Sequence, residues 1–221
     1  MIVSQRGGIE HMGQQYLSIK DPVKEVEIIE KSKFIAQAFP VRTEEEAIGI
    51  LNQIKKEYYK ATHNVPAYII GEKQEIQKCS DDGEPSGTAG IPILEIIKKE
   101  NLTNTLIIVT RYFGGIKLGA GGLIRTYAHM AKKAISYSKI IKYVLCEKIV
   151  VIIDYTYWGK LENKCNILGF HIDKIDFLEK VYVHFHLQKN QKGMFCKLVE
   201  EITNGEGDIR LLGEEYISIS I

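Results

Sequence analysis

Six segments in the last third of the chain constrain the fold most strongly, because few architectures accommodate their order. From about residue 140 the sequence reads as a strand, a helix, two strands, a helix and a final strand, a βαββαβ order. Helical spacing is shown by Trp158, Leu161, Cys165 and Leu168 in the first helix and by Phe195, Leu198, Val199 and Ile202 in the second. We therefore expect a ferredoxin-like domain over residues 140–221.

The preceding part of the chain alternates strand and helix signals. Residues 24–41 read as two strands, and Thr43 and Glu46 have the capping-box spacing that opens a helix. Two short strands around Gly71, a helix near residues 93–99 and the apolar strand "TNTLIIVTRYF" follow. The last helix is predicted to bury Ile124, Ala128, Ala131 and Ile135. These signals predict a flexible arm over residues 1–16, a mixed domain over residues 17–138 and an α+β chain overall.

Composition excludes several classes of protein. The 221 residues are 45% hydrophobic and 26% charged, with a formal net charge of +1, so no global charge attracts nucleic acid or an acidic partner. No apolar run approaches the roughly twenty residues that span a bilayer, and no signal peptide is visible, so we expect a cytoplasmic protein without membrane contact. Cys79, Cys146, Cys165 and Cys196 form no CxxC pair and are interpreted as small buried side chains.

An acidic, glycine-rich segment, "SDDGEPSGTAG", precedes the helix near residue 93. The carboxylates of Asp81, Asp82 and Glu84 could present oxygens to Mg²⁺ or Ca²⁺, but their spacing is not that of an EF-hand. Asp, Gly, Pro and Ser also form turns, and Ser86 or Thr88 could cap the following helix. The turn and the metal site both remain open from the residues alone.

A second glycine-rich segment, "RYFGGIKLGAGGLIR", carries basic residues between a strand and a helix. This order places backbone N–H groups at a helix N-terminus, where an anion is favoured. It matches neither the Walker A nor the Rossmann pattern, so neither standard nucleotide site is expected. The candidate binding residues are Arg111, Lys117, Gly119, Gly121, Gly122 and Arg125. Three acids in one segment and three bases in the other could instead pair with each other.

No nucleophile motif is present, because G-x-S-x-G is absent. His63 could act as a general base, since histidine titrates near neutrality, although a histidine at a helix-to-strand junction is more often structural. His184 and His186 alternate on a predicted strand without a visible third metal ligand. We therefore assign no catalytic residue, no metal ligand and no cofactor.

Three motifs together, "ATHNVPAYIIG", "SDDGEPSGTAGIPIL" and "VTRYFGGIKLGAGGLIRTY", resemble the IMPACT family and in particular its two-domain bacterial branch, YigZ. The preceding "KSKFIAQAFPV" is similar to the family's N-terminal strand pair. The resemblance implies a first domain with the ribosomal protein S5 domain 2-like fold, as in domain IV of translation elongation factor G and the GHMP kinases. It also implies a second domain similar to the ferredoxin-like domain V of that factor.

The resemblance further implies a role near translation. Eukaryotic IMPACT proteins regulate translation under nutrient stress by contacting a ribosome-associated activator of an initiation-factor kinase, whereas the bacterial branch has no firmly established reaction. We therefore expect a regulator or accessory factor that binds RNA, the ribosome or a translation-associated protein, with no enzymatic activity. The basic segment would be the binding surface, with Asp81, Asp82, Glu84 and His63 as accessory residues.

The alternative from a different class is a small-ligand-binding protein or enzyme that acts on a phosphorylated metabolite. In that reading residues 114–122 would cradle the phosphate, and Asp81, Asp82 or Glu84 would hold Mg²⁺. The two hypotheses differ in whether the acidic side chains face a ligand or are engaged inside the protein.

Overall fold

The structure is a computed structural model that describes residues 15–220. The chain divides into two compact units, the first ending at Lys142 and the second running from Tyr143 to Ser218, with the last residues from Ile219 grouped with the first. Most of the expected N-terminal arm, residues 1–14, lies outside the described residues, whereas Gln15 and Tyr16, also assigned to that arm, begin strand β1.

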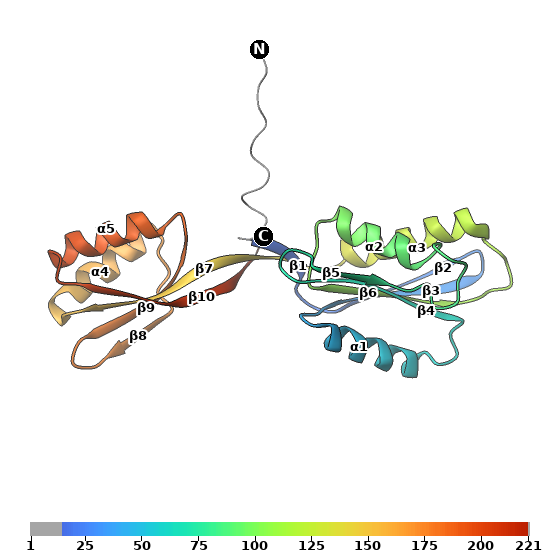
Figure 1. Ribbon diagram of the computed structural model, residues 1–221, viewed down its shortest axis with the longest axis horizontal. Coiled ribbons are helices and arrows are strands. Elements are labelled where there is room, and N and C mark those ends of the chain that lie inside the picture. The colour runs from blue at the N-terminus through green and yellow to red at the C-terminus, as the bar shows by residue number, and fades with distance from the viewer. Residues whose placement is uncertain (1–14, 221) are drawn as a thin grey trace, which may run out of the picture. The chain divides into compact units, whose positions relative to one another are not determined.

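The first unit is built on a five-stranded antiparallel sheet. Its strands lie in the order β2-β3-β6-β4-β5. Helices α2 and α3 cover one face of this sheet and α1 covers the other (Figure 1). The elements are β1 (Gln15–Ile19), β2 (Val23–Ile29), β3 (Ser32–Pro40), α1 (Glu44–Glu57), β4 (His63–Ile70), β5 (Ile76–Cys79), α2 (Gly90–Lys99), β6 (Thr105–Tyr112) and α3 (Gly119–Ser136).

Helix α1 begins with the predicted capping box. Thr43 is its N-cap, and the Thr43 hydroxyl oxygen accepts a 3.2 Å hydrogen bond from the Glu46 backbone N–H. The Glu46 carboxylate in turn accepts a 2.6 Å bond from the backbone N–H of Arg42, one residue before the cap. The first bond satisfies an N–H group that a helix start leaves without a partner inside the helix, and the second fixes the residue before the cap.

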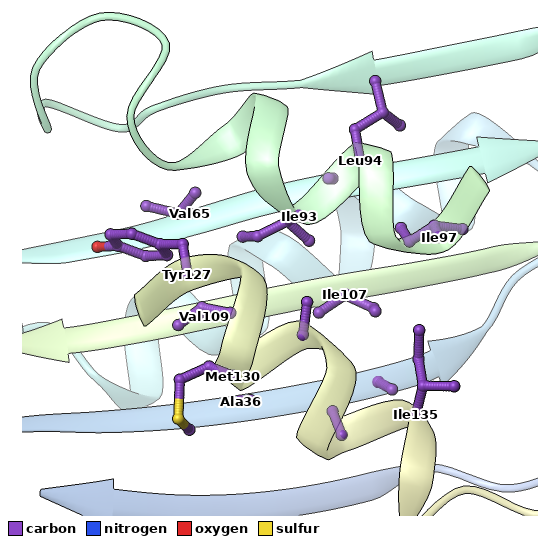
Figure 2. Packing of buried hydrophobic residues seen from close by; sticks show 14 of the residues in the cluster. Ala36, Val65, Ile93, Leu94, Ile97, Ile107, Val109, Tyr127, Met130 and Ile135 are labelled. Atoms are coloured by element: carbon purple, nitrogen blue, oxygen red, sulfur yellow. The ribbon is translucent and has the colours of Figure 1, made fainter. Parts of the chain in front are cut away.

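The core of the first unit lies between its sheet and helices α2 and α3. Figure 2 shows Ile93 and Ile97 of α2 packed over the sheet near Val65 and Ile107, and Leu94 belongs to the same cluster. On α3 the buried face differs from the prediction, because Ile124 is 43% exposed and Ala128 is only half-buried. The buried residues of α3 are Leu123, Thr126, Tyr127, Met130, Ala131, Ala134 and Ile135.

The second unit contains the six predicted segments in the predicted order. They are β7 (Ile140–Ile153), α4 (Tyr155–Leu168), β8 (Lys174–Phe177), β9 (Val181–Gln188), α5 (Lys192–Thr203) and β10 (Asp208–Ser220). In the sheet, β10 pairs with β7, followed by β9 and β8. Numbered within the unit this order is 4-1-3-2, which follows from the split-βαβ connection. The α+β class and the two-domain layout are thereby confirmed.

The structure also shows the surroundings of the four cysteines and of His184 and His186. All four cysteines are free; Cys146 and Cys165 are buried as interpreted, whereas Cys79 and Cys196 are only half-buried. His184 and His186 contact carboxylates on neighbouring elements, with His184 Nε2 3.2 Å from Asp176. No helix in the part of the chain that the structure describes is long and apolar enough to cross a membrane.

Candidate functional site

Strand pairing brings the candidate residues together at one end of the first sheet. Phe34 on β3, Arg111 on β6 and His63 on β4 are directly opposite one another in the antiparallel register. Directly opposite residues of a sheet point to the same face, and here that face is the one covered by α2 and α3, because Phe34 belongs to their core. The acidic segment, residues 80–89, connects β5 to α2 and contacts His63 and Arg111.

Asp81 caps helix α2 from outside the helix. Its Oδ1 accepts hydrogen bonds from the backbone N–H groups of Gly90 at 2.8 Å and Ala89 at 3.1 Å, and its Oδ2 accepts one from Gly87 at 2.7 Å. Partial burial would raise the pKa of Asp81, but these three donors outweigh it and hold the pKa below its usual value. The prediction that Ser86 or Thr88 caps this helix is therefore wrong, since the N-cap residue, Ala89, makes no side-chain cap.

Asp82 ties the acidic segment to β4 and α1. Its Oδ2 accepts a 2.7 Å hydrogen bond from the Asn64 backbone N–H, and its Oδ1 pairs with Lys55 at 2.6 Å. The Asp82 backbone carbonyl lies 2.8 Å from His63 Nδ1. Both carboxylate oxygens of Asp82 are thus engaged within the protein, and His63 is held by the segment that it packs against.

Glu84 lies at the centre of a buried polar cluster. Its side chain is only 3% exposed, and its Oε1 accepts 2.7 Å hydrogen bonds from both Arg111 Nη1 and the hydroxyl of Tyr127. Its Oε2 lies 3.8 Å from His63 Nε2. Burial raises the pKa of Tyr127, and the hydrogen bond to Glu84 raises it further, so the hydroxyl remains a donor. The cluster stabilises a charge pair that would be costly to bury unpaired.

Arg111 is also enclosed by two aromatic rings. Its guanidinium carbon lies 5.4 Å from the ring centroids of both Phe34 and Phe113. Its Nη2 donates a 3.4 Å bond to the Ser32 hydroxyl, and its Nε is buried without a partner among the described residues. The sequence predicts an open binding surface for Arg111, but the structure places it in the interior, paired with Glu84.

Lys117 and Arg125 differ from Arg111 because they remain on the surface. Both are exposed, and within residues 15–220 neither has a hydrogen-bond or ion-pair partner. They flank the start of α3, whose N-cap residue, Leu118, provides no side-chain cap and whose first turn contains no acidic residue. A Cβ added at Gly121 would lie 3.5 Å from Arg125 Nη1, which places the Arg125 guanidinium over the first helical turn.

The glycines of this segment serve two purposes. Gly119 has a φ of +70°, which suits glycine, whereas a Cβ at Gly122 would lie 3.0 Å from the Cβ of Leu118. Gly119 and Gly121 are exposed, so their backbone is open to solvent. The first N–H groups of any helix have no partner within the helix. The start of α3 therefore presents free donors next to two free cations.

The acidic and basic segments of the site differ in whether their charged side chains are engaged within the protein. The three carboxylates of the acidic segment are engaged by backbone N–H groups, a lysine, an arginine and a tyrosine. In the described part of the chain, no three His, Cys, Asp or Glu side chains are grouped so that they could hold a metal ion. The arrangement can bind an anion at the start of α3, and its acidic half stabilises the fold beneath that surface.

Three residues of the site were missed by the sequence analysis. Lys55 and Tyr127 are helical residues that contact the acidic segment from α1 and α3, and Phe113 covers Arg111. Phe113 and Tyr127 both lie within the quoted motif "VTRYFGGIKLGAGGLIRTY", whereas Lys55 carried no such signal. The contacts of Lys55 and Tyr127 depend on tertiary packing.

The fold and the site define a two-domain α+β protein with a buried Glu–Arg–Tyr cluster beneath an exposed basic segment. Two family models match the chain: the Impact N-terminal domain over residues 30–135 and a domain of unknown function (DUF1949) over residues 151–206. The IMPACT family member YvyE of Bacillus subtilis (strain 168) is 42% identical over 199 residues, covering 90% of this chain and 92% of that relative. The chain therefore belongs to the IMPACT family, as its motifs predicted.

Two further comparisons agree with this assignment. The IMPACT family member YigZ of Escherichia coli (strain K12) is 36% identical over 116 residues, which cover 52% of this chain and 57% of YigZ. The crystal structure of a hypothetical protein is similar with a TM-score of 0.59 and 26% identity, covering 89% of this chain and 96% of that one. The predicted YigZ-like relationship is thereby confirmed.

Proposed function

We propose that this protein is a translation-related regulator or accessory factor that contacts RNA, free or in the ribosome, through the basic start of α3. The observation that carries the proposal is the contrast between Arg111, which is buried against Glu84, and Lys117 and Arg125, which are exposed and unpaired within residues 15–220. Membership of the IMPACT family supports the link to translation. In this proposal the protein works in the cytoplasm, where ribosomes are found.

Phosphate is the anion that suits this surface. The partial positive charge of a helix N-terminus, its free N–H groups and two cations all favour a phosphate oxygen. RNA presents such groups in a row, so Lys117 and Arg125 can each contact one without reading sequence. Because the whole chain has a net charge of only +1, this local surface would have to provide the attraction.

The alternative, an enzyme acting on a phosphorylated metabolite, receives less support. It requires Asp81, Asp82 or Glu84 to hold Mg²⁺, yet each of these carboxylates already accepts hydrogen bonds from protein groups. Binding a metal would require these bonds to break and α2 to lose its cap. We therefore favour RNA as the ligand.

The test is co-sedimentation with ribosomes and a shift assay with ribosomal RNA fragments, at low and moderate salt. The wild-type protein is expected to bind at low salt and to weaken steeply as salt rises, because phosphate contacts release counterions. The double variant Lys117→Glu, Arg125→Glu should bind more weakly and with a shallower salt dependence. Lys132→Glu, which changes an exposed cation near the other end of the same helix, is the matched control and should bind like the wild type.

Two outcomes would count against the proposal. If the wild type neither pellets with ribosomes at low salt nor shifts RNA, the proposed RNA contact is wrong. If it pellets with a salt-independent affinity, a protein contact on the ribosome replaces the RNA contact.

A further inference from the structure

We infer that the RNA bound at this surface is single-stranded, and that one unpaired base stacks on the ring of Phe113. This inference rests on the proposed function and specifies the class of its ligand. Phe113 was not among the residues that the sequence singled out.

The ring of Phe113 is both exposed and supported. Phe113 is 47% exposed, although large aromatic side chains are usually buried. Its ring contacts the guanidinium of Arg111 at 5.4 Å, and Phe34 contacts the same guanidinium at 5.4 Å. The order Phe34, Arg111, Phe113 leaves the outer part of the Phe113 ring for a ligand. A base could extend this stack by one member.

The backbone under the ring is fixed by several hydrogen bonds. The Phe113 N–H donates to the Thr62 hydroxyl at 3.0 Å, and the Gly114 N–H donates to the Ser32 hydroxyl at 3.1 Å. Arg111 also donates to the Ser32 hydroxyl, at 3.4 Å. The Ser32 hydroxyl therefore holds both Arg111, which lies beneath the ring, and Gly114, which follows Phe113. A ring held in place before binding loses little conformational freedom when a base stacks on it.

The surroundings of the ring favour a nucleotide. Lys117 is four residues further along the chain, a span of at most about 14 Å, and of the three residues between them only Ile116 carries a side chain. Glu84, the carboxylate paired with the arginine beneath the ring, is only 3% exposed. An aromatic platform beside unpaired cations is the combination that binds single strands, by stacking bases and holding phosphates.

A duplex would not use this ring. The bases of an A-form helix are stacked on each other, and proteins reach mainly its phosphates and 2′-hydroxyls. Lys117 and Arg125 could still contact duplex phosphates, but Phe113 would contribute nothing. The difference between single-stranded and duplex RNA therefore isolates the role of the ring.

The experiment measures binding of fluorescein-labelled oligo(A) and of a labelled, blunt-ended RNA duplex to the full chain. Phe113→Leu keeps an apolar side chain over Arg111 but removes the flat ring, and Phe113→Trp keeps a ring. Ile116→Ala, which alters another exposed apolar residue of the same segment, is the control for a hydrophobic protein-type surface. Melting temperatures confirm that each variant is folded.

We expect Phe113→Leu to weaken oligo(A) binding by about 5- to 150-fold, the range for loss of one stacked base. Phe113→Trp and Ile116→Ala should bind oligo(A) like the wild type, and duplex binding should be unchanged in all three variants. An oligo(A) in which one adenine is replaced by 2-aminopurine should lose fluorescence on binding the wild type, because stacking quenches this base.

The inference is overturned if Phe113→Leu binds oligo(A) as tightly as the wild type, if Ile116→Ala causes an equal loss, or if 2-aminopurine is not quenched. In each of those cases the proposed function survives as long as Lys117→Glu with Arg125→Glu still weakens binding. If the wild type binds neither of the two RNAs, both the inference and the proposed function are overturned.

Discussion

Arg111 Nη1 donates a 2.7 Å hydrogen bond to Glu84 Oε1, although the two residues are 27 positions apart and both are nearly inaccessible to solvent. The pair joins the acidic segment before α2 to the end of β6, the strand that leads into the basic segment. Of the three basic residues of the site, Arg111 is thus paired inside the protein, whereas Lys117 and Arg125 are exposed.

Removing one partner of the buried pair should be costly. We expect Glu84→Gln or Arg111→Met to lower the free energy of unfolding of the first unit by about 3–5 kcal/mol, because each leaves the other group buried without its charge partner. The double variant Glu84→Leu, Arg111→Met should lie much closer to the wild type. Urea unfolding measures both effects, and losses that simply add in the double variant would contradict this role for the pair.

Tyr127→Phe should destabilise the same cluster without changing its packing. Loss of the buried hydroxyl leaves Glu84 Oε1 with one donor fewer, at a cost of about 1–3 kcal/mol. Because the pKa of Tyr127 is raised in the folded state, stability falls as pH rises above the unfolded value of about 10. The free energy of unfolding, measured at increasing alkaline pH, should therefore fall more steeply for the wild type than for Tyr127→Phe. Parallel curves would contradict the assignment of a neutral donor.

The cap supplied by Asp81 predicts a dependence on acidic pH. Asp81→Ala should destabilise α2 at neutral pH by roughly 1–2 kcal/mol, the usual value of a lost helix cap. Since the pKa of Asp81 is lowered in the folded state, the ionised carboxylate stabilises the protein above its unfolded pKa of about 4, and this contribution is lost as pH falls through the lower folded value. The difference between wild type and variant should shrink below about pH 4. A difference that stays constant with pH would mean that the charge of Asp81 is irrelevant.

Gly114 tests the close approach of the basic segment to the β2–β3 turn. An added Cβ would lie 1.9 Å from the backbone carbonyl oxygen of Lys31, which cannot move aside as a side chain could. Gly114→Ala should therefore lower the melting temperature clearly. Gly49→Ala is the control, because Gly49 lies in α1 with nothing within 4 Å of a new Cβ, and it should stabilise the helix by about 0.5–1 kcal/mol. Equal effects of the two changes would contradict the close approach.

Local signals were sufficient for much of this fold. The capping box of Thr43 and Glu46 lies within four consecutive residues, so it could be read directly, and the βαββαβ order of the second unit required only the sequence of elements. Helix α2 followed from the spacing of Ile93 and Ile97, both of which are buried. Each of these features depends on residues that are close together in the chain.

Tertiary contacts explain what the sequence did not reveal. Asp81 caps α2 from eight and nine residues away, through a turn that sequence spacing does not specify. On α3, Leu123 and Tyr127 have the same helical spacing as Ile124 and Ala128, so only packing against the sheet and Glu84 decides which pair is buried. Whether the acids and bases pair with each other was open for the same reason. The answer is mixed, since Arg111 pairs and the other two bases do not.

The most direct test of the account compares RNA affinity with stability in two variants of the same protein. The account predicts that Lys117→Glu with Arg125→Glu weakens binding to ribosomal RNA while its melting temperature stays at the wild-type value. It predicts the reverse for Glu84→Gln: a lower melting temperature with unchanged affinity at temperatures where the protein is folded. The account is contradicted if the charge-reversed double variant binds RNA as tightly as the wild type, or if it unfolds as early as Glu84→Gln.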